Sequence, residues 1–171
     1  MTKLLVDTIN SQIGHILIVT DSEHLCMLDF AACEARIMNL LQKRYQRFDL
    51  IAITNPQGFS QQVQAYLAGD LQSIDNIPAN PGGTPFQQQV WSALRTIPPG
   101  TTISYRELAT RIGKPAAYRA VGMANSQNPV AIVLPCHRVV GTNGSLTGYA
   151  GGIERKRWLL QHEGVDCSKL K

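Results

Sequence analysis

The second half of the chain holds two short helical patterns separated by a glycine, and this arrangement constrains the fold most. The first pattern begins at Ser104, which Glu107 would complete as a capping box, and Gly113 ends it. The second runs from about Pro115 to Asn125 and is rich in small residues. Two short helices joined by such a turn are typical of DNA-binding helix-turn-helix units, although close helix packing inside a domain also favours small residues.

A cysteine followed directly by a histidine lies at the end of an apolar segment. The apolar run 130–134 is followed by Pro135, and Cys136 and His137 come next. The thiolate is the reactive form of cysteine, and a neighbouring base helps to generate it at neutral pH. Most unpaired cysteines are buried structural residues, but a rigid proline before the thiol and polar residues after it favour a nucleophile.

Charge is divided unevenly along the 171 residues. Residues 1–80 hold 5 Lys and Arg against 8 Asp and Glu, whereas residues 81–171 hold 11 against 4. This imbalance indicates either a polyanionic partner for the second half, with nucleic acid as the first candidate, or a solvated basic face. No apolar run is long enough to cross a membrane, and the N-terminus does not resemble a secretory signal. Four cysteines without a CxxC pair fit the reducing cytoplasm.

The first half predicts a small antiparallel sheet with helices. Strands are expected at residues 4–9, 14–19, 25–30 and 51–53. One helix is expected from Ser60, as its N-cap, to Ala68. Another is indicated by the apolar periodicity of Ile37, Leu40, Leu41, Tyr45 and Phe48.

A boundary is expected between the two halves. Residues 70–83 have the Pro, Gly and Asn content of a linker. Directly after them, Thr84-Pro85-Phe86-Gln87 offers an N-cap, a first-turn proline and a capping-box glutamine. We therefore expect one domain with its linker at 1–80 and a second domain at 81–171.

Together these residues resemble the O6-alkylguanine-DNA alkyltransferase family. The matching motifs include Thr84-Pro85-Phe86-Gln87, Ile103-Ser104-Tyr105, Arg119-Ala120-Val121-Gly122, Pro135-Cys136-His137-Arg138, Gly148-Tyr149-Ala150 and His162-Glu163-Gly164. They cover most of the second half, and the match over residues 1–80 is weaker. The resemblance implies an α+β fold, with a ribonuclease H-like N-terminal domain and a mainly helical, winged helix-turn-helix C-terminal domain.

The resemblance also implies a DNA repair protein that flips O6-alkylguanine out of the duplex. The alkyl group would then move irreversibly to the protein's own cysteine in a single turnover. Cys136 would be the nucleophile, His137 its base, and Glu163 the group that orients His137. Tyr105 would hydrogen-bond or protonate the leaving guanine, and Asn128 would fix the cysteine loop.

The implied partner is double-stranded DNA, contacted in the minor groove without sequence preference. Arg119 would fill the gap left by the flipped base. The other residues expected against DNA are Ala120, Tyr118, Ala117, Gly122 and Ser104. Tyr118 departs from the family pattern, in which small residues are usual beside this arginine.

The implied pocket would be lined by Val139, Tyr149, Ala150, Gly148 and Ala131. The side chains of Ala131 and Ala150 end at Cβ, which predicts room for alkyl groups larger than methyl, with O4-alkylthymine as a further candidate substrate. No cofactor is expected, and the chain is expected to act as a cytoplasmic monomer. The irregular spacing of His15, His24, Cys26 and Cys33 favours packing and surface roles over a zinc site.

Three other functions remain open from the sequence. An alkyltransferase-like lesion binder would share the scaffold but lack the cysteine. A helix-turn-helix regulator would need no Cys-His pair. A cysteine hydrolase would place its cysteine and histidine far apart in sequence.

Overall fold

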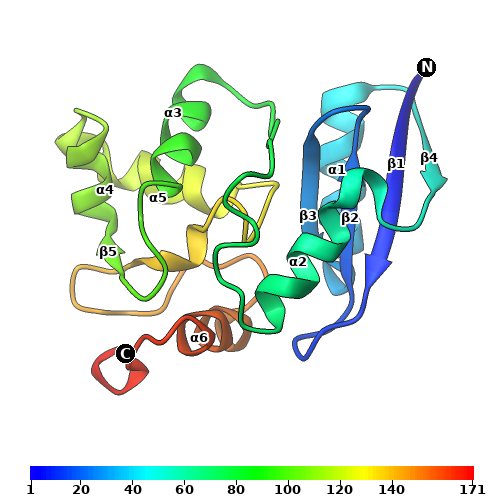
Figure 1. Ribbon diagram of the computed structural model, residues 1–171. Coiled ribbons are helices and arrows are strands. Elements are labelled where there is room, and N and C mark those ends of the chain that lie inside the picture. The colour runs from blue at the N-terminus through cyan, green and yellow to red at the C-terminus, as the bar shows by residue number, and fades with distance from the viewer. The chain divides into compact units, whose positions relative to one another are not determined.

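The computed structural model describes all 171 residues, and the chain divides into two compact units, Met1–Gly82 and Gly83–Lys171 (Figure 1). The first unit is built on a sheet and the second is mainly helical, so the expected α+β class is confirmed. No helix in either unit is long and apolar enough to span a bilayer.

A four-stranded sheet forms the centre of the first unit. Its strands are β1 (Thr2–Ile9), β2 (Ile16–Thr20), β3 (Leu25–Phe30) and β4 (Phe48–Ala52), in the order β3-β2-β1-β4. The first three strands pair antiparallel, as predicted, but β4 pairs parallel to β1, so the sheet is mixed. The prediction that Phe48 belongs to the preceding helix is wrong, because the chain turns at Gln46, where φ is 57°, before Phe48 begins β4.

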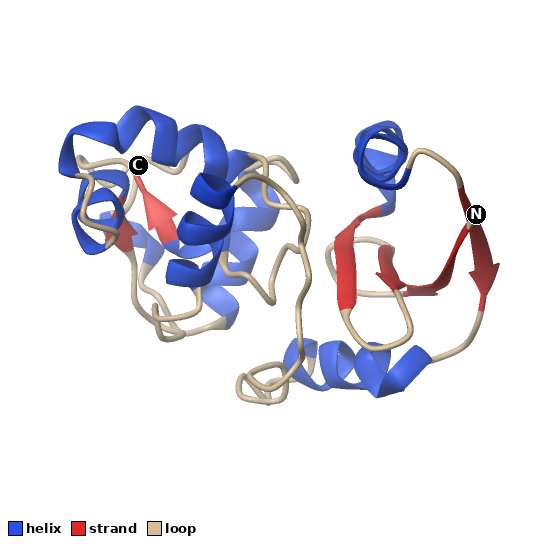
Figure 2. Cartoon of the chain, turned by 90° about the horizontal axis from the view of Figure 1, so that it is seen from above, coloured by secondary structure: helices blue, strands red, loops and turns tan.

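The helices α1 (Glu34–Tyr45) and α2 (Phe59–Leu67) lie on opposite sides of this sheet (Figure 2). On one side, Ile37 and Leu41 of α1 pack against Leu4, Val19 and Met27. Strand side chains of the opposite parity are also fully buried, among them Ile16, Ile18, Leu28 and Phe30. Burial on both faces explains why β2 and β3 are almost continuously apolar rather than alternating.

Two local expectations for this unit need correction. The helix α2 begins after Gly58, whose φ is 77°, and Ser60 is buried in the first turn, so Ser60 is not the N-cap. The stretch predicted to be a linker is packed rather than loose. Ile74 and Ile77 are buried, and Ala79 forms a bridge with Leu25.

The second unit contains four α-helices and a short two-stranded parallel sheet. The helices are α3 (Pro85–Leu94), α4 (Tyr105–Arg111), α5 (Tyr118–Ser126) and α6 (Ile153–His162). The strands are β5 (Ile103–Ser104) and β6 (Val139–Val140). Short 3-10 helices occur in both units. The first unit contains η1 (Ala31–Cys33) and η2 (Pro56–Gly58), and the second contains η3 (Pro115–Ala117), η4 (Cys136–Arg138) and η5 (Cys167–Lys169).

The helix-turn-helix is present as predicted, formed by α4 and α5. Ser104 accepts a hydrogen bond from the Glu107 amide at 3.0 Å and so caps α4. The predicted capping box is not completed, because the Glu107 side chain binds Arg111. Gly113 follows α4 with φ 75°, a conformation that glycine adopts without a Cβ clash. At the start of α3, Thr84 and Gln87 form the full capping box that the sequence predicted.

Candidate active site

A tight turn leads into the Cys-His pair. Asn128 is buried; its side-chain amide donates to the Leu134 carbonyl at 2.7 Å, and its side-chain oxygen accepts from the Val130 amide at 2.9 Å. Between these anchors Ile132 has φ 72°, a strained conformation for a β-branched residue. Asn128 therefore holds both ends of a strained turn, and only Pro135 separates this turn from Cys136.

Cys136 and His137 begin η4 and are buried, with exposed fractions of 5% and 0%. The Cys136 carbonyl accepts a hydrogen bond from the Asn125 side chain on α5 at 3.3 Å. None of the four cysteines forms a disulfide. The thiol-bearing residue is thus fixed through its own backbone by a helix of the helix-turn-helix.

His137 lies against a carboxylate. Its Nε2 is 3.0 Å from Oε2 of Glu163, although the approach falls outside hydrogen-bond geometry. Its other ring nitrogen, Nδ1, is buried and has no hydrogen-bond partner within the protein. Glu163 itself directly follows α6, as its C-cap residue. The histidine therefore has one nitrogen facing a carboxylate and the other available for a proton.

Arg138 completes this network and was not assigned a role from the sequence. Its guanidinium binds Glu163 in a bidentate pair, from Nε to Oε1 at 2.9 Å and from Nη2 to Oε2 at 2.7 Å. A third donor, Nη1, reaches the Ile97 carbonyl at 2.5 Å. All of these groups are buried, so the pairing offsets the cost of placing charges in the interior.

The surrounding groups determine the protonation states of His137 and Glu163. Burial lowers the pKa of His137, the nearby Glu163 carboxylate opposes this shift, and the charges of Arg138 and Lys156 add to it. Burial alone would raise the pKa of Glu163, but hydrogen bonds from Arg138 and contact with His137 outweigh it and hold this pKa below its usual range. At neutral pH the arrangement is a neutral imidazole beside an ionised carboxylate, which suits a base.

Lys156 on α6 is a second buried cation near the thiol. Its Nζ donates to the Val139 carbonyl at 2.6 Å and to the Thr147 carbonyl at 2.9 Å. Burial lowers the pKa of Lys156 to about 8, and the Cys136 thiolate opposes this shift. Lys156 therefore joins β6 to the 147–150 segment and places positive charge where it favours a thiolate.

Tyr105 lies close to the same groups. Its hydroxyl donates to the Thr147 carbonyl at 3.0 Å, and its ring centroid is 5.9 Å from Lys156 Nζ. Burial raises the pKa of Tyr105, and the Cys136 thiolate charge adds to this, whereas contacts with Thr147 and Asn125 oppose it. The phenol therefore stays protonated at neutral pH and can donate a hydrogen bond.

The residues expected to line the pocket differ in how deeply they are buried. Val139 is fully buried beside η4, and Ala131 is buried in the strained turn. A Cβ on Gly148 would come within 3.0 Å of the Tyr105 hydroxyl, so this glycine lies against the phenol. Tyr149 is half-buried and Ala150 is exposed. No three His, Cys, Asp or Glu side chains gather as a metal-binding group.

The residues expected against DNA lie at the start of α5 and the cap of α4. Arg119 and Ala120 are exposed, and Ala117 and Tyr118 are half-buried. Gly122 differs, because its Cα faces inward and a Cβ there would lie 3.6 Å from the Tyr105 ring. This is an ordinary van der Waals distance, so the packing of α5 against Tyr105 would accept a Cβ at this position.

Besides Arg138, Asn125 and Lys156 were assigned no functional role from the sequence. Lys156 had a signal, because its spacing places it on the same helix face as Leu159 and Leu160, and these two leucines mark that face as buried. Asn125 had none, since its role depends on a contact with Cys136 from a different part of the chain.

Comparison with known proteins identifies both units. The family model of the 6-O-methylguanine DNA methyltransferase ribonuclease-like domain matches residues 4–81, and that of the DNA binding domain of the same family matches residues 85–165. A methylated-DNA–protein-cysteine methyltransferase of Shigella flexneri is 46% identical over 167 residues, which cover 96% of this chain and 98% of the relative.

Solved structures agree with the sequence comparisons. A crystal structure of Mycobacterium tuberculosis OGT in complex with DNA aligns with a TM-score of 0.78 and 39% identity, covering 99% of this chain and 95% of that one. An O6-methylguanine-DNA methyltransferase from Pyrococcus kodakaraensis aligns with a TM-score of 0.70 and 29% identity, covering 95% and 99%.

Proposed function

The chain belongs to the 6-O-methylguanine DNA methyltransferase family, and from this we propose that it repairs DNA by moving the alkyl group of O6-alkylguanine onto its own Cys136. The observation that carries the proposal is the buried series Cys136, His137, Glu163 and Arg138, in the unit whose family model is a DNA binding domain.

In the proposed reaction, His137 Nδ1 takes the thiol proton through a bridging water. The Cys136 sulfur then attacks the alkyl carbon, so an S–C bond forms while the C–O6 bond breaks. The electron pair of the broken bond stays with guanine, which gains negative charge. Tyr105 donates a hydrogen bond or its proton to the base and so offsets this charge.

Each supporting residue has a separate part in this reaction. Glu163 holds the imidazole by its contact with Nε2, and Arg138 keeps Glu163 ionised. Asn128 fixes the turn before the nucleophile. A thioether at Cys136 has no leaving group under these conditions, so each protein acts once.

We further propose that the unit Gly83–Lys171 binds double-stranded DNA as a monomer, with α5 in the minor groove. Arg119 is exposed on this helix and would occupy the stack position vacated by the flipped base. Because a reactive thiol must stay reduced, we assign the reaction to the cytoplasm.

The pocket wall is proposed to admit alkyl groups larger than methyl, with O4-alkylthymine as a further candidate. The support is the short side chain of Ala150, which is exposed in the 147–150 segment next to Tyr105. Rates of methyl, ethyl and benzyl transfer should fall with size in Ala150→Phe and much less in the wild type. A wild type that rejects every group above methyl would contradict this assignment.

The test of the function is transfer of label from duplex DNA that carries O6-[³H]methylguanine. Covalent label should appear on the wild type and on Cys167→Ala, which removes another buried cysteine of the same unit, but not on Cys136→Ala. Tight binding without covalent label in the wild type would instead identify a lesion-binding protein. Binding to one preferred operator would identify a regulator.

A further inference from the structure

Two arginines and a tyrosine form a cluster on the surface of the helix-turn-helix. Cζ of Arg106, on α4, lies 4.1 Å from the centroid of the Tyr118 ring, and Cζ of Arg119 lies 5.8 Å from the same centroid. Both distances are within the range of cation–π attraction. We call Arg106, Tyr118 and Arg119 the arginine–tyrosine cluster.

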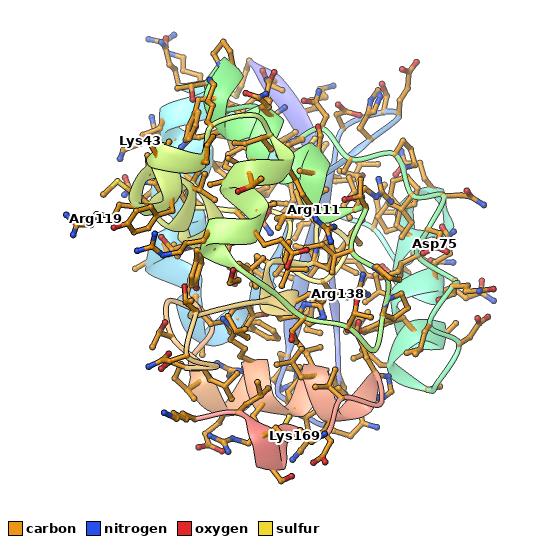
Figure 3. The ribbon with its side chains drawn as sticks, turned by 90° about the vertical axis from the view of Figure 1, so that its left-hand side faces the viewer. Lys43, Asp75, Arg111, Arg119, Arg138 and Lys169 are labelled. Carbon is orange, nitrogen blue, oxygen red and sulfur yellow. The ribbon has the colours of Figure 1, made fainter.

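Local structure brings these side chains together. Arg106 is the second residue of α4, directly after its cap, and Tyr118 and Arg119 are the first two residues of α5. Both arginines are exposed and the ring is half-buried. Figure 3 shows Arg119 extending outward from the edge of the unit.

The positive charge of the cluster is not neutralised within the protein. Neither arginine lies within ion-pair distance of a carboxylate, and the nearby Glu107 is already paired with Arg111 at 2.9 Å. A guanidinium stacked on a ring keeps its edge N–H groups free for phosphate oxygens. The cluster therefore offers two held cations to a polyanion.

We propose that Tyr118 is a positioning residue for duplex DNA: its ring holds Arg106 toward a backbone phosphate and Arg119 toward the base stack. This inference rests on the proposed function, because it takes DNA as the partner. Two long arginine side chains lose rotamer freedom when they bind, and a ring that orders them beforehand reduces this cost.

Alternatively, the ring of Tyr118 would hinder the entry of α5 into the minor groove. The minor groove is only about 6 Å wide, and the neighbouring Ala117 and Ala120 are small. A ring that merely crowded the groove would slow repair, so its removal would accelerate the reaction. The two possibilities predict opposite effects of the same substitution.

The first test compares repair of a duplex containing O6-methylguanine with benzyl transfer from free O6-benzylguanine, which needs no base flipping. Tyr118→Ala should slow duplex repair roughly fivefold, as expected from the loss of two exposed cation–π contacts, and leave the free-base rate unchanged. Tyr118→Phe should restore the duplex rate, since the ring and not the hydroxyl carries the effect. Arg111→Ala, which removes a paired cation from α4, the helix of Arg106, is the matched control.

The second test uses the salt dependence of binding to undamaged duplex. Arg106→Ala should reduce the slope of log affinity against log salt by about one phosphate contact. Tyr118→Ala should reduce it by a similar amount although it removes no charge, and the double variant should add little. Tyr118→Phe and Arg111→Ala should keep the wild-type slope.

Faster duplex repair by Tyr118→Ala, or an unchanged salt slope in that variant, would overturn the inference. Equal losses on duplex and free base would also overturn it, because they would show that Tyr118 supports the fold. If the wild type transfers benzyl from the free base but neither binds nor repairs duplex, the proposed function fails instead.

Discussion

Glu163 has two buried partners, and the geometry assigns them different tasks. The bidentate pair with Arg138 keeps the carboxylate ionised, and the contact at 3.0 Å holds the imidazole of His137. Because Arg138 already neutralises the carboxylate, His137 can remain neutral in the interior. A histidine paired with an unshared buried carboxylate would instead be driven toward its charged form, which is no base.

The lowered pKa of His137 gives the protein a measurable pH dependence of stability. Between the folded pKa and about 6.5, the unfolded state binds a proton that the folded state does not, so the free energy of unfolding falls as pH drops below about 6.5. The lowered pKa of Glu163 acts separately, because its contribution is lost only as pH falls below about 4.3. Urea titrations at several pH values should show the loss of unfolding free energy below about pH 6.5 in the wild type and in His15→Gln. His137→Gln should not show this loss. The same loss in His137→Gln would contradict the assignment.

Lys156 should act on the thiol rather than on DNA. In Lys156→Met the pH at which Cys136 reacts with iodoacetamide should move upward, and benzyl transfer from the free base should slow by about tenfold, equivalent to one pH unit in thiolate supply. Lys169→Met removes an exposed lysine of the same unit and should change neither. An unaltered iodoacetamide profile in Lys156→Met would restrict Lys156 to holding the Val139 and Thr147 carbonyls.

At the scale of elements, the turn at 128–134 positions Cys136, which we propose as the nucleophile. Asn128→Ala removes two buried hydrogen bonds that hold a turn containing Ile132 at positive φ. We expect the free energy of unfolding to fall by about 2–4 kcal/mol, with alkyl transfer slowed on duplex and free base alike. Asn143→Ala, in an exposed loop, is the control for urea unfolding. Wild-type stability in Asn128→Ala would show that the turn does not depend on the hydrogen bonds of the Asn128 side chain.

Elements whose signals are local could be predicted from the sequence. The Thr84 and Gln87 capping box, the Gly113 turn and the three antiparallel strands each depend on residues close together in the chain. The strand β4 pairs with β1 across more than forty residues, so neither its parallel direction nor the loss of Phe48 from the helix could be deduced from periodicity. The Ser60 cap failed because Gly58, with its positive φ, starts the helix earlier.

The site residues likewise fall into those that the sequence could predict and those that it could not. The Cys136–His137 pair was visible because its residues are adjacent, and the family resemblance added Glu163, Tyr105 and Asn128. The bonds of Arg138 to Glu163 and of Lys156 to Thr147 join separate segments, so they required the fold.

At the scale of the whole molecule, positive charge is concentrated in the second half of the chain. The excess of positive charge lies in residues 81–171, and the exposed Arg106 and Arg119 belong to it. Affinity for undamaged duplex should therefore fall steeply with salt and vary little between unrelated sequences. Lys43→Ala in the first unit should leave both properties unchanged, as equilibrium titrations at several salt concentrations would show. A strong preference for one sequence would contradict non-specific binding.

In the proposed reaction, Cys136 itself accepts the alkyl group and is consumed. Intact-protein and peptide mass spectrometry after incubation with a large excess of O6-methylguanine duplex tests it most directly. We expect a gain of one methyl group per protein, located on the peptide that contains Cys136, with the amount of repaired guanine equal to the amount of protein. Repaired guanine in excess of protein, or a methyl group on another residue with Cys136 unmodified, would contradict it.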